Sequence, residues 1–308
     1  MTNRPFGRTG LYVSPLGFGA APIGYLNTDQ DQAGRTINLL LDAGVNLIDT
    51  AAAYEGSESM IATAVGHRRE QFVLVSKCGP KLPDVADAAW SPKLIAASVD
   101  RSLARLKTDR LDVVLLHSCT LAVLQQGDAL AELVKARDAG KIRFVGYSGD
   151  NDAAVYAANL AEVAVVQTSV NIADQANIDI VLPAARKKNL GVIAKRPIAN
   201  AAWKDPARQP GFYGDYASTY SRRLARMELT PTDLGYPDDS DDVWSDLALR
   251  FTLSLPGVSA AIVGTTNPEN AKKNLAAAEK GPLAAETVRK IRDRFVTARA
   301  DESWPGQG

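Results

Sequence analysis

The sequence predicts an α/β protein, a (β/α)8 TIM barrel with an N-terminal hairpin, a long loop after strand seven and an extra C-terminal helix. Two observations support this prediction: short apolar runs rich in β-branched residues, and amphipathic stretches that alternate with them. The runs are mostly about 20 to 40 residues apart and apolar throughout, which is typical of buried parallel strands joined by helices. They are Leu16–Gly19, Asn46–Asp49, Phe72–Lys77, Leu111–His117, Ile142–Tyr147, Val163–Gln167, Gly191–Lys195 and Val258–Val263.

The stretches between the runs carry the start and stop signals of helices. Ser91 precedes Pro92, and Asn267 precedes Pro268, so each pair gives a polar cap followed by proline in the first turn. Between the third and fourth runs, apolar residues recur at helical spacing. These residues are Ile95, Val99, Leu103 and Leu106. Glycines at positions 44, 66 and 140 are the expected helix stops.

Three pieces fall outside the repeat. A possible hairpin around Arg8-Thr9-Gly10 is expected to close one end of the barrel. The stretch Asn200–Ser240 is rich in Pro, Gly, Asp and aromatic residues, and such long insertions are more often functional than idle. A last helix, Leu283–Arg299, places Val288, Ile291 and Phe295 on one face. No linker interrupts the pattern, so residues 1–308 are predicted to form a single domain.

Composition and charge limit the classes of function. Hydrophobic residues make up 46% of the 308 residues, which is enough for a large core. Lys plus Arg and Asp plus Glu both number 35, so no bulk field favours nucleic acid or an anionic membrane, and neither is expected as a partner. The first residues, MTNRPFGRTG, lack the continuous apolar core of a signal peptide, and no run of about 18 apolar residues occurs, so we expect a cytoplasmic protein. Nothing indicates an oligomeric state.

Neither the cysteines nor the acidic run predicts a metal or redox site. Cys78 and Cys119 are too few for a disulfide framework and lack metal spacing, so we expect small core or loop residues. The aspartates at 238, 239, 241 and 242 precede a helix, where negative charge favours the N-terminus. No metal is predicted.

The chemistry is expected at the C-terminal tips of the strands, where the active sites of such barrels lie. Asp49, Lys77 and His117 end the second, third and fourth runs, and Tyr54 follows in the loop after Asp49. A buried lysine beside a carboxylate leaves a local positive field, which lowers the pKa of a nearby phenol and makes it a general acid for a carbonyl oxygen. His117 can donate a hydrogen bond to that oxygen.

Each of these residues has an ordinary structural interpretation when taken alone. An aspartate at a strand end usually caps the next turn, a lysine there usually extends to solvent, and a single loop tyrosine usually packs on the surface. The occurrence of Asp49, Lys77, His117 and Tyr54 at successive strand ends favours a shared site over four separate structural roles.

The segment from Asp49 to Glu58, DTAAAYEGSE, resembles the Asp-Thr-Ala-x-x-Tyr-Gly-x-Ser-Glu motif of the aldo-keto reductase family. Further similarities follow in chain order over nearly the whole sequence. They are Val75-Ser76-Lys77, Leu115-Leu116-His117, Gly146-Tyr147-Ser148, Val165-Val166-Gln167, and the tail Gly264-Thr265-Thr266-Asn267-Pro268-Glu269-Asn270 with Asn274-Leu275 after it.

The resemblance implies a barrel that holds NADP(H) or NAD(H) without a Rossmann fold, with Tyr54 as acid/base and Asp49, Lys77 and His117 as supports. Ser148 and Gln167 match positions that hold the nicotinamide carboxamide, with ordinary loop hydrogen bonding as the alternative. Thr265, Thr266 and Asn267 precede a helix whose free N–H groups favour phosphate, although Asn267 as a plain cap needs no ligand. The other candidate cofactor residues are Lys195, Arg196, Gly264, Asn270, Lys273 and Asn274.

The sequence departs from the family pattern at several positions. Glu55 replaces a glycine after the tyrosine, and Gly149 replaces an asparagine that often contacts the carboxamide. Lys195-Arg196 stand where many relatives have an aromatic residue that stacks on nicotinamide, so stacking is lost or a cationic side chain replaces it.

Cofactor choice depends on another departure. Gly264 and Asn270 replace basic residues that many relatives use for the 2′-phosphate, which leaves Lys272, Lys273 and Arg196 to approach it. NADP(H) is therefore predicted ahead of NAD(H), with weaker discrimination than usual.

Two other functions stay open: a nicotinamide-binding regulatory protein like the channel subunits of this fold, and an aldolase-type barrel with Lys77 as Schiff-base lysine. The substrate is expected to be a small carbonyl compound or the corresponding alcohol or sugar. The walls of the substrate pocket are expected in Pro80–Trp90 and in Asn200–Ser240. Aromatic residues in these loops can equally pack the loops on themselves. The candidate wall residues are Trp90, Trp203, Phe212, Tyr213 and Tyr216.

Overall fold

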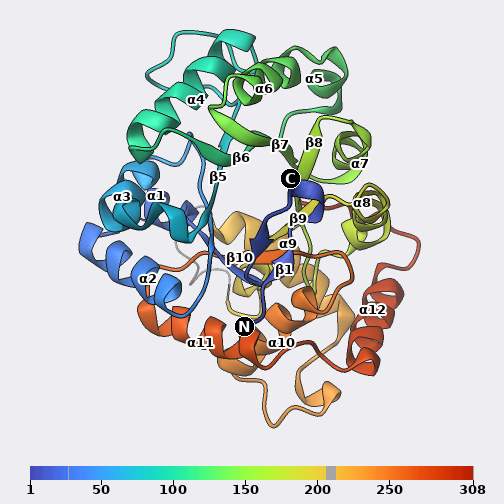
Figure 1. The fold of residues 1–308 in the computed structure, drawn as a ribbon. Coiled ribbons are helices and arrows are strands. Elements are labelled where there is room, and N and C mark those ends of the chain that lie inside the picture. Colours follow the sequence, from blue (N-terminus) through green and yellow to red (C-terminus); the bar gives the residue numbers. More distant parts are fainter. Residues whose placement is uncertain (27, 206–212, 308) are drawn as a thin grey trace.

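Each of the eight predicted runs forms a parallel strand, and together they close into a barrel (Figure 1). In this computed structural model, residues 1–26, 28–205 and 213–307 are described, without the side chains of 213–216. Neighbouring strands follow the order β10, β3, β4, β5, β6, β7, β8, β9. Their bounds are β3 Leu16–Gly19, β4 Leu47–Asp49, β5 Val73–Cys78, β6 Leu111–His117, β7 Ile142–Ser148, β8 Val163–Ser169, β9 Gly191–Lys195 and β10 Ala260–Val263. The predicted fold class is confirmed.

Helices follow the strands and surround the barrel (Figure 1). Ser91 and Asn267 cap α4 and α11 with their side chains, as their sequence context predicts. The α-helices are α1 Ala21–Tyr25, α2 Gln30–Asp42, α3 Ser57–Val65, α4 Pro92–Leu106, α5 Leu121–Gln126, α6 Asp128–Asp138, α7 Asn151–Asn159, α8 Ala176–Lys187, α9 Tyr213–Met227, α10 Asp241–Leu253, α11 Pro268–Glu279 and α12 Ala285–Arg299. Short 3-10 helices occupy Gly7–Thr9, Gly66–Gln71, Ala199–Ala201 and Thr232–Leu234. None of the helices in the described parts is long and apolar enough to cross a membrane.

The N-terminal hairpin closes the end of the barrel where the strands begin. Strands β1 (Arg4–Pro5) and β2 (Tyr12–Val13) pair antiparallel, and Phe6 between them is fully buried against the barrel interior. Gly7 has φ +56°, and a Cβ there would lie 2.2 Å from the backbone nitrogen of Gly191, so the close approach requires glycine. The opposite end, where the strands finish, carries the candidate site.

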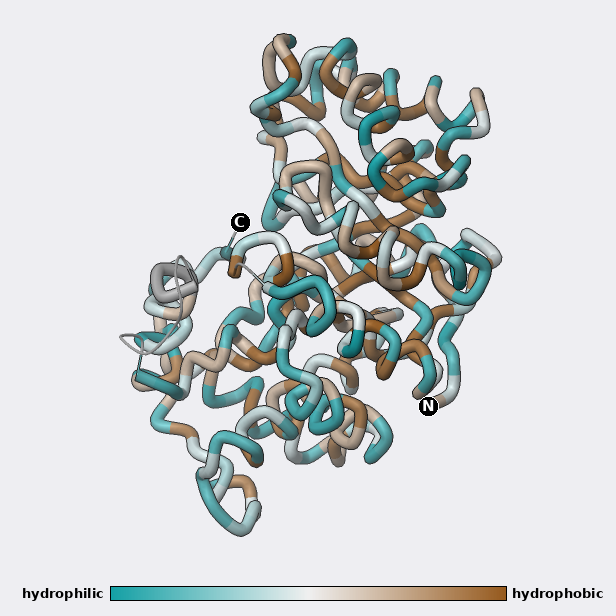
Figure 2. Tube along the Cα trace, turned by 90° about the vertical axis from the view of Figure 1, so that its left-hand side faces the viewer, coloured by the Kyte–Doolittle hydropathy of each residue, from teal (hydrophilic) through white to brown (hydrophobic). Residues whose placement is uncertain are grey.

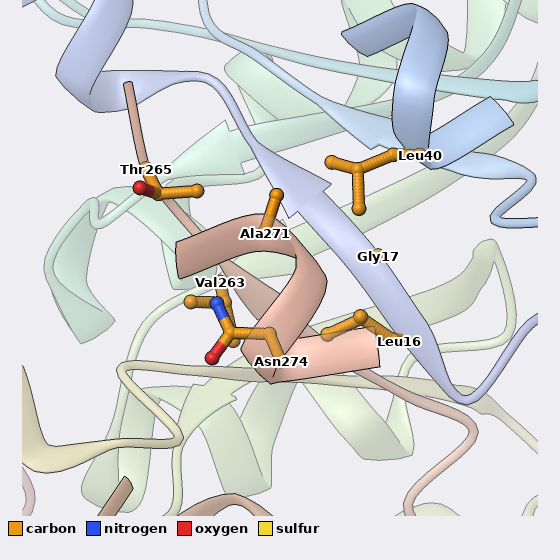
Figure 3. Close-up of a pocket in the computed structure, with 7 residues that line it drawn as sticks. All are labelled: Leu16, Gly17, Leu40, Val263, Thr265, Ala271 and Asn274. Atoms are coloured by element: carbon orange, nitrogen blue, oxygen red, sulfur yellow. The ribbon is translucent and has the colours of Figure 1, made fainter. Parts of the chain in front are cut away.

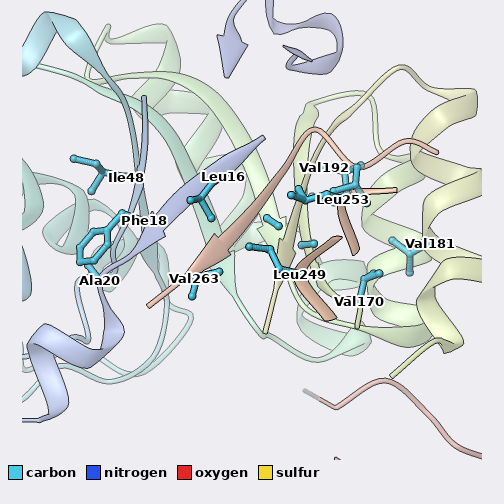
Figure 4. Packing of buried hydrophobic residues seen from close by; sticks show 14 of the residues in the cluster. Leu16, Phe18, Ala20, Ile48, Val170, Val181, Val192, Leu249, Leu253 and Val263 are labelled. Atoms are coloured by element: carbon cyan, nitrogen blue, oxygen red, sulfur yellow. The ribbon is translucent and has the colours of Figure 1, made fainter. Parts of the chain in front are cut away.

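Two apolar layers hold the barrel. One fills its interior, and the other lies between the strands and the helices, where Phe18, Val192 and Leu249 pack (Figure 4). Apolar residues run through the middle of the molecule and hydrophilic residues gather on the outer helices and loops (Figure 2). The last helix, α12, buries Ile291 and Phe295, as its pattern predicts.

The segment after β9 differs from the expected loop, because its described residues include α9 and two 3-10 turns. Ala217, Tyr220, Leu224 and Met227 of α9 are buried, and this 3-4 spacing gives the helix one apolar face against the core. The segment is rich in glycine and proline, which are typical of loops. Its composition therefore does not predict the helix. Phe212 lies outside the described residues, and so do the side chains of Tyr213 and Tyr216.

Candidate active site

The polar candidates form the last layer of the barrel interior. Side chains alternate along a strand, so the residue two positions after an interior residue points inward again. Leu47, Val75, Leu115, Val165 and Ile193 belong to the interior cluster. Two residues further along the same strands come Asp49, Lys77, His117, Gln167 and Lys195. The fold therefore brings five polar side chains to one mouth.

Asp49 and Lys77 form a buried ion pair at the centre of this layer. Lys77 Nζ lies 2.6 Å from Asp49 Oδ2 and donates to the carbonyl oxygen of Thr50 at 2.8 Å. Burial raises the pKa of Asp49 and lowers the pKa of Lys77, and the partner opposes the shift in each case. Because this ion pair is shielded from water, the hydrogen bonds between its two groups and to neighbouring protein atoms hold it in one defined geometry.

Tyr54 lies over this pair in the loop after β4. The Lys77 ammonium is 5.0 Å from the centre of the Tyr54 ring, and the His117 ring lies 5.8 Å from it at 80°. Tyr54 N donates to the Ala51 carbonyl, and Ser57 N donates to the Tyr54 carbonyl, so the loop backbone is fixed on both sides of Tyr54. The four residues predicted as one group are thus in contact.

His117 is neutral at neutral pH. Burial, with Lys77 and Lys195 as further causes, lowers its pKa well below 6.5. Its Nδ1 is buried and has no hydrogen-bond partner among the described residues. A neutral imidazole has one N–H and one free lone pair, so His117 can donate to an uncharged oxygen in the mouth.

Ser148 and Gln167 are buried next to the ion pair. Ser148 Oγ donates to Gln167 Oε1 at 3.0 Å, and Gln167 Nε2 donates to Asp49 Oδ1 at 2.7 Å. The structure also explains Gly149, since a Cβ there would lie 2.3 Å from the Tyr147 hydroxyl, which donates to Cys119 O. An asparagine at 149 would displace that hydroxyl.

Lys195 and Arg196 are both bound by other groups of the protein. Lys195 Nζ lies 2.8 Å from Asp150 Oδ2, and its side chain is 12% exposed. Arg196 donates to Ser169 Oγ and to the carbonyl oxygen of Gln307, so the C-terminal segment lies against the mouth beside β8 and β9. The cationic side chains that replace the expected aromatic residue are therefore anchored to the protein.

The segment from Gly264 to Asn274 comprises the turn after β10 and the first part of α11. Asn267 Oδ1 accepts from Glu269 N, the capping role that needs no ligand, and Thr265 Oγ1 accepts from Asn267 N. The carbonyl oxygen of Thr266 accepts from Gln32 and Thr36 of α2. Thr265 and Asn274 line a narrow gap against β3 and α2, in which no water molecule fits (Figure 3).

The basic residues near this segment have acidic partners. Lys272 Nζ lies 2.8 Å from Glu269, and Lys273 Nζ lies 2.7 Å from Asp242 of α10. Gly264 and Asn270 are exposed. A 2′-phosphate near these lysines would compete with carboxylates for them.

Two of the candidate wall residues, Trp90 and Trp203, pack against other residues of the protein. Trp203 stacks on Trp244 at 5.6 Å and 7°, which is the packing alternative, and Trp90 packs on Gly79. Tyr213 begins α9, and its side chain is outside the described residues. Burial raises the pKa of both Cys78 and Cys119, so neither is a ready nucleophile.

Two residues of the mouth escaped the sequence analysis. Tyr25, at the end of α1, lies edge-on to Tyr54 at 5.4 Å. Asp150 accepts from Thr168, Ser169 and Asn177 in addition to pairing with Lys195. Both residues follow predicted strands, and that position was the available signal.

Comparison with known proteins connects this geometry to one family. The model of the Aldo/keto reductase family matches residues 15–294. L-galactose dehydrogenase of Arabidopsis thaliana is 27% identical over 98% of this chain and 96% of its own length. The NADH-specific methylglyoxal reductase of Escherichia coli is 26% identical over 90% of this chain and 93% of its own. The holo form of an aldo-keto reductase from Bacillus halodurans superposes with a TM-score of 0.80 at 26% identity, covering 96% of both chains.

Proposed function

This chain belongs to the aldo/keto reductase family of oxidoreductases, and from that premise we propose that it reduces an aldehyde or ketone, or oxidises the corresponding alcohol or sugar, with Tyr54 as general acid/base. The supporting observation is the position of the Lys77 ammonium, 5.0 Å from the Tyr54 ring centre and 2.6 Å from Asp49. A cation held there stabilises the phenolate that remains when Tyr54 gives up its proton.

Four side chains have distinct roles in the proposed reaction. In reduction, the Tyr54 hydroxyl gives its proton to the carbonyl oxygen, and in oxidation the phenolate takes a proton from the alcohol. Neutral His117 donates to the same oxygen and orients it. Asp49 keeps Lys77 in place, because it accepts one of the ammonium protons.

A nicotinamide dinucleotide fits the residues around this group, and when bound it supplies or accepts the hydride. The fit is supported by His117 Nδ1, a buried polar atom of the mouth that has no hydrogen-bond partner among the described residues. Ser148 and Gln167 would hold the carboxamide, while Lys195 and Arg196 would border the ring. The segment with Gly264, Thr265, Thr266, Asn267, Asn270, Lys273 and Asn274 would hold the phosphates and the adenosine.

We keep NADP(H) ahead of NAD(H), by a small margin. Lys272 and Lys273 supply positive charge near the segment, but Glu269 and Asp242 already pair with them. The similarity to an NADH-specific reductase supports only a narrow preference for NADP(H) over NAD(H) in this chain.

A Schiff-base role for Lys77 gains no support from its surroundings. Its side chain is 1% exposed, and its Nζ is hydrogen-bonded to both Asp49 and Thr50, so the nitrogen is poorly placed to attack a carbonyl carbon.

The test of the function compares Tyr54→Phe with wild type on a panel of aldehydes, ketones and sugars with both cofactors. We expect turnover to fall by at least about 100-fold, the usual scale for a positioned general acid. Cofactor affinity, measured by fluorescence titration, should stay within about threefold, because the ring itself remains. Tyr12→Phe is the matched control, since Tyr12 is 60% exposed at the other end of the barrel. Near-normal turnover of Tyr54→Phe would refute the assignment.

A further inference from the structure

The loop after β5 is held in one conformation by its own side chains. Lys81 Nζ donates to the carbonyl oxygens of Val85, Ala86 and Asp87 at 2.5 to 2.8 Å. At the neck of the loop, Trp90 N donates to Gly79 O at 2.9 Å, and a Cβ on Gly79 would collide with the Trp90 ring. These bonds favour one conformation of the segment.

Arg101 of α4 joins this loop to the loop that carries Tyr54. Its Nε lies 2.7 Å from Asp84 Oδ2 in the loop after β5. Its NH1 donates to the carbonyl oxygen of Ala52 at 2.7 Å, two residues before Tyr54. The Arg101 side chain is 14% exposed, so the bond to Ala52 is shielded from water. The same guanidinium holds the pKa of Asp84 below its usual range.

The Tyr54 loop is held mainly by bonds to its backbone. Thr50 N donates to Val75 O, Ala52 N donates to Lys77 O, and Tyr54 N donates to Ala51 O. The Lys77 ammonium binds the Thr50 carbonyl. Arg101 adds a charged donor from α4 to the carbonyl oxygen of Ala52, a residue that is 3% exposed.

We propose that Arg101 is a positioning residue for Tyr54, and that Asp84 links its orientation to the loop after β5. The inference rests on the proposed function, because it assumes that Tyr54 moves the proton. Without Arg101, the Ala52 peptide loses its charged donor and can rotate, which moves the Tyr54 hydroxyl relative to Lys77 and His117. Displacements of about 1 Å at a catalytic group can cost up to about a hundredfold in rate.

Arg101→Met is the primary variant, and Arg105→Met is its control. Arg105 lies one helical turn further and also reaches Asp84, at 3.4 Å, but among the described residues it forms no hydrogen bond to the Tyr54 loop. We expect Arg101→Met to lower kcat by about ten- to a hundredfold with cofactor affinity within about threefold, and Arg105→Met to stay within about twofold. Near-normal kcat in a folded Arg101→Met would overturn the proposal while leaving the function intact.

A double-mutant cycle separates positioning from general structural damage. If Arg101 acts through Tyr54, then adding Arg101→Met to Tyr54→Phe should cost no more than about twofold beyond Tyr54→Phe alone. Losses that multiply would overturn the proposal. If Tyr54→Phe itself is near normal, the proposed function fails, and the role of Arg101 fails with it.

Asp84→Asn and Arg101→Lys cover the case in which Arg101→Met does not fold. Asp84→Asn keeps the bond to Ala52 and removes the charge on the other side, so kcat should fall by less than in Arg101→Lys, which cannot reach both partners at once. The reverse order would contradict the proposed link. Thermal melting of every variant shows whether the fold is retained.

Discussion

Two aspartate–lysine pairs of nearly equal length lie in different surroundings in this protein. Asp49 and Lys77 are 2.6 Å apart in the barrel mouth, with side chains 3% and 1% exposed. Asp242 and Lys273 are 2.7 Å apart near α11, with side chains 65% and 55% exposed. The distance alone does not distinguish them, but the access of water does.

Because the Asp49–Lys77 pair is buried, its stability depends on every group that is hydrogen-bonded to it. Gln167 donates to the second oxygen of Asp49, and Thr50 accepts from Lys77, so the removal of one group leaves several others unpaired. Water can replace either partner of the exposed pair, and salt screens it. Buried pairs therefore define a geometry, and exposed pairs adjust to what binds beside them.

The largest expected effect follows from this difference. Asp49→Ala should lower the free energy of unfolding by about 3 to 5 kcal/mol, because it leaves the Lys77 ammonium buried and unpaired. Asp242→Ala should cost less than about 1 kcal/mol. Urea unfolding of both variants measures the two values, and similar losses would show that burial is not what separates the pairs.

A third carboxylate, Asp174, is buried with a looser partner. Arg223 NH1 lies 3.4 Å from Asp174 Oδ1, and burial raises the pKa of Asp174 to about 6. Charges on Asp150, Lys195 and Arg223 act on it, and Tyr220 and the Gln307 N–H donate to it.

The raised pKa fixes the direction of the pH dependence. A carboxyl whose pKa is higher in the folded state stabilises the fold below about pH 4 and loses that contribution as pH rises through about 6. The stability of wild type relative to Asp174→Asn should thus fall by on the order of 2 kcal/mol across that window. A difference that is independent of pH would show that Asp174 does not titrate there.

The strands and the central group could be predicted because buried positions repeat with a fixed period. Asp49, Lys77 and His117 each follow an apolar run and lie where the run places them. Arg101 could not be found in this way, because it lies on a helix and its role depends on which loops lie next to each other in space. Helix α9 was missed because the apolar spacing of Ala217, Tyr220 and Leu224 lies in a segment of otherwise loop-like composition.

A smaller effect is expected at the helix cap. Asn267→Ala removes the bond to Glu269 N and should cost about 1 kcal/mol of stability, by urea unfolding. If Asn267 only caps α11, the affinities for both cofactors should stay within about twofold, whereas a larger loss would make it a ligand contact as well.

The smallest effect concerns cofactor choice. Asp242→Asn should strengthen NADPH binding by a few-fold, on the order of 1 kcal/mol or less, because it frees Lys273, and Lys273→Ala should weaken binding by a similar factor. NADH affinity should not respond to either change. Fluorescence titrations at fixed ionic strength decide it: an NADH dissociation constant more than about tenfold below that for NADPH would overturn the NADP(H) preference.

The most direct test of the central claim, that Lys77 tunes Tyr54 as the proton donor, is the pH dependence of kcat for reduction in Lys77→Met. Reduction requires the protonated phenol, so activity is present below the phenol pKa and lost above it. Loss of the ammonium raises that pKa, and the unpaired Asp49 acts in the same direction. The basic limb should therefore move upward by about one pH unit or more while kcat falls. A lower kcat with an unchanged basic limb would contradict the account.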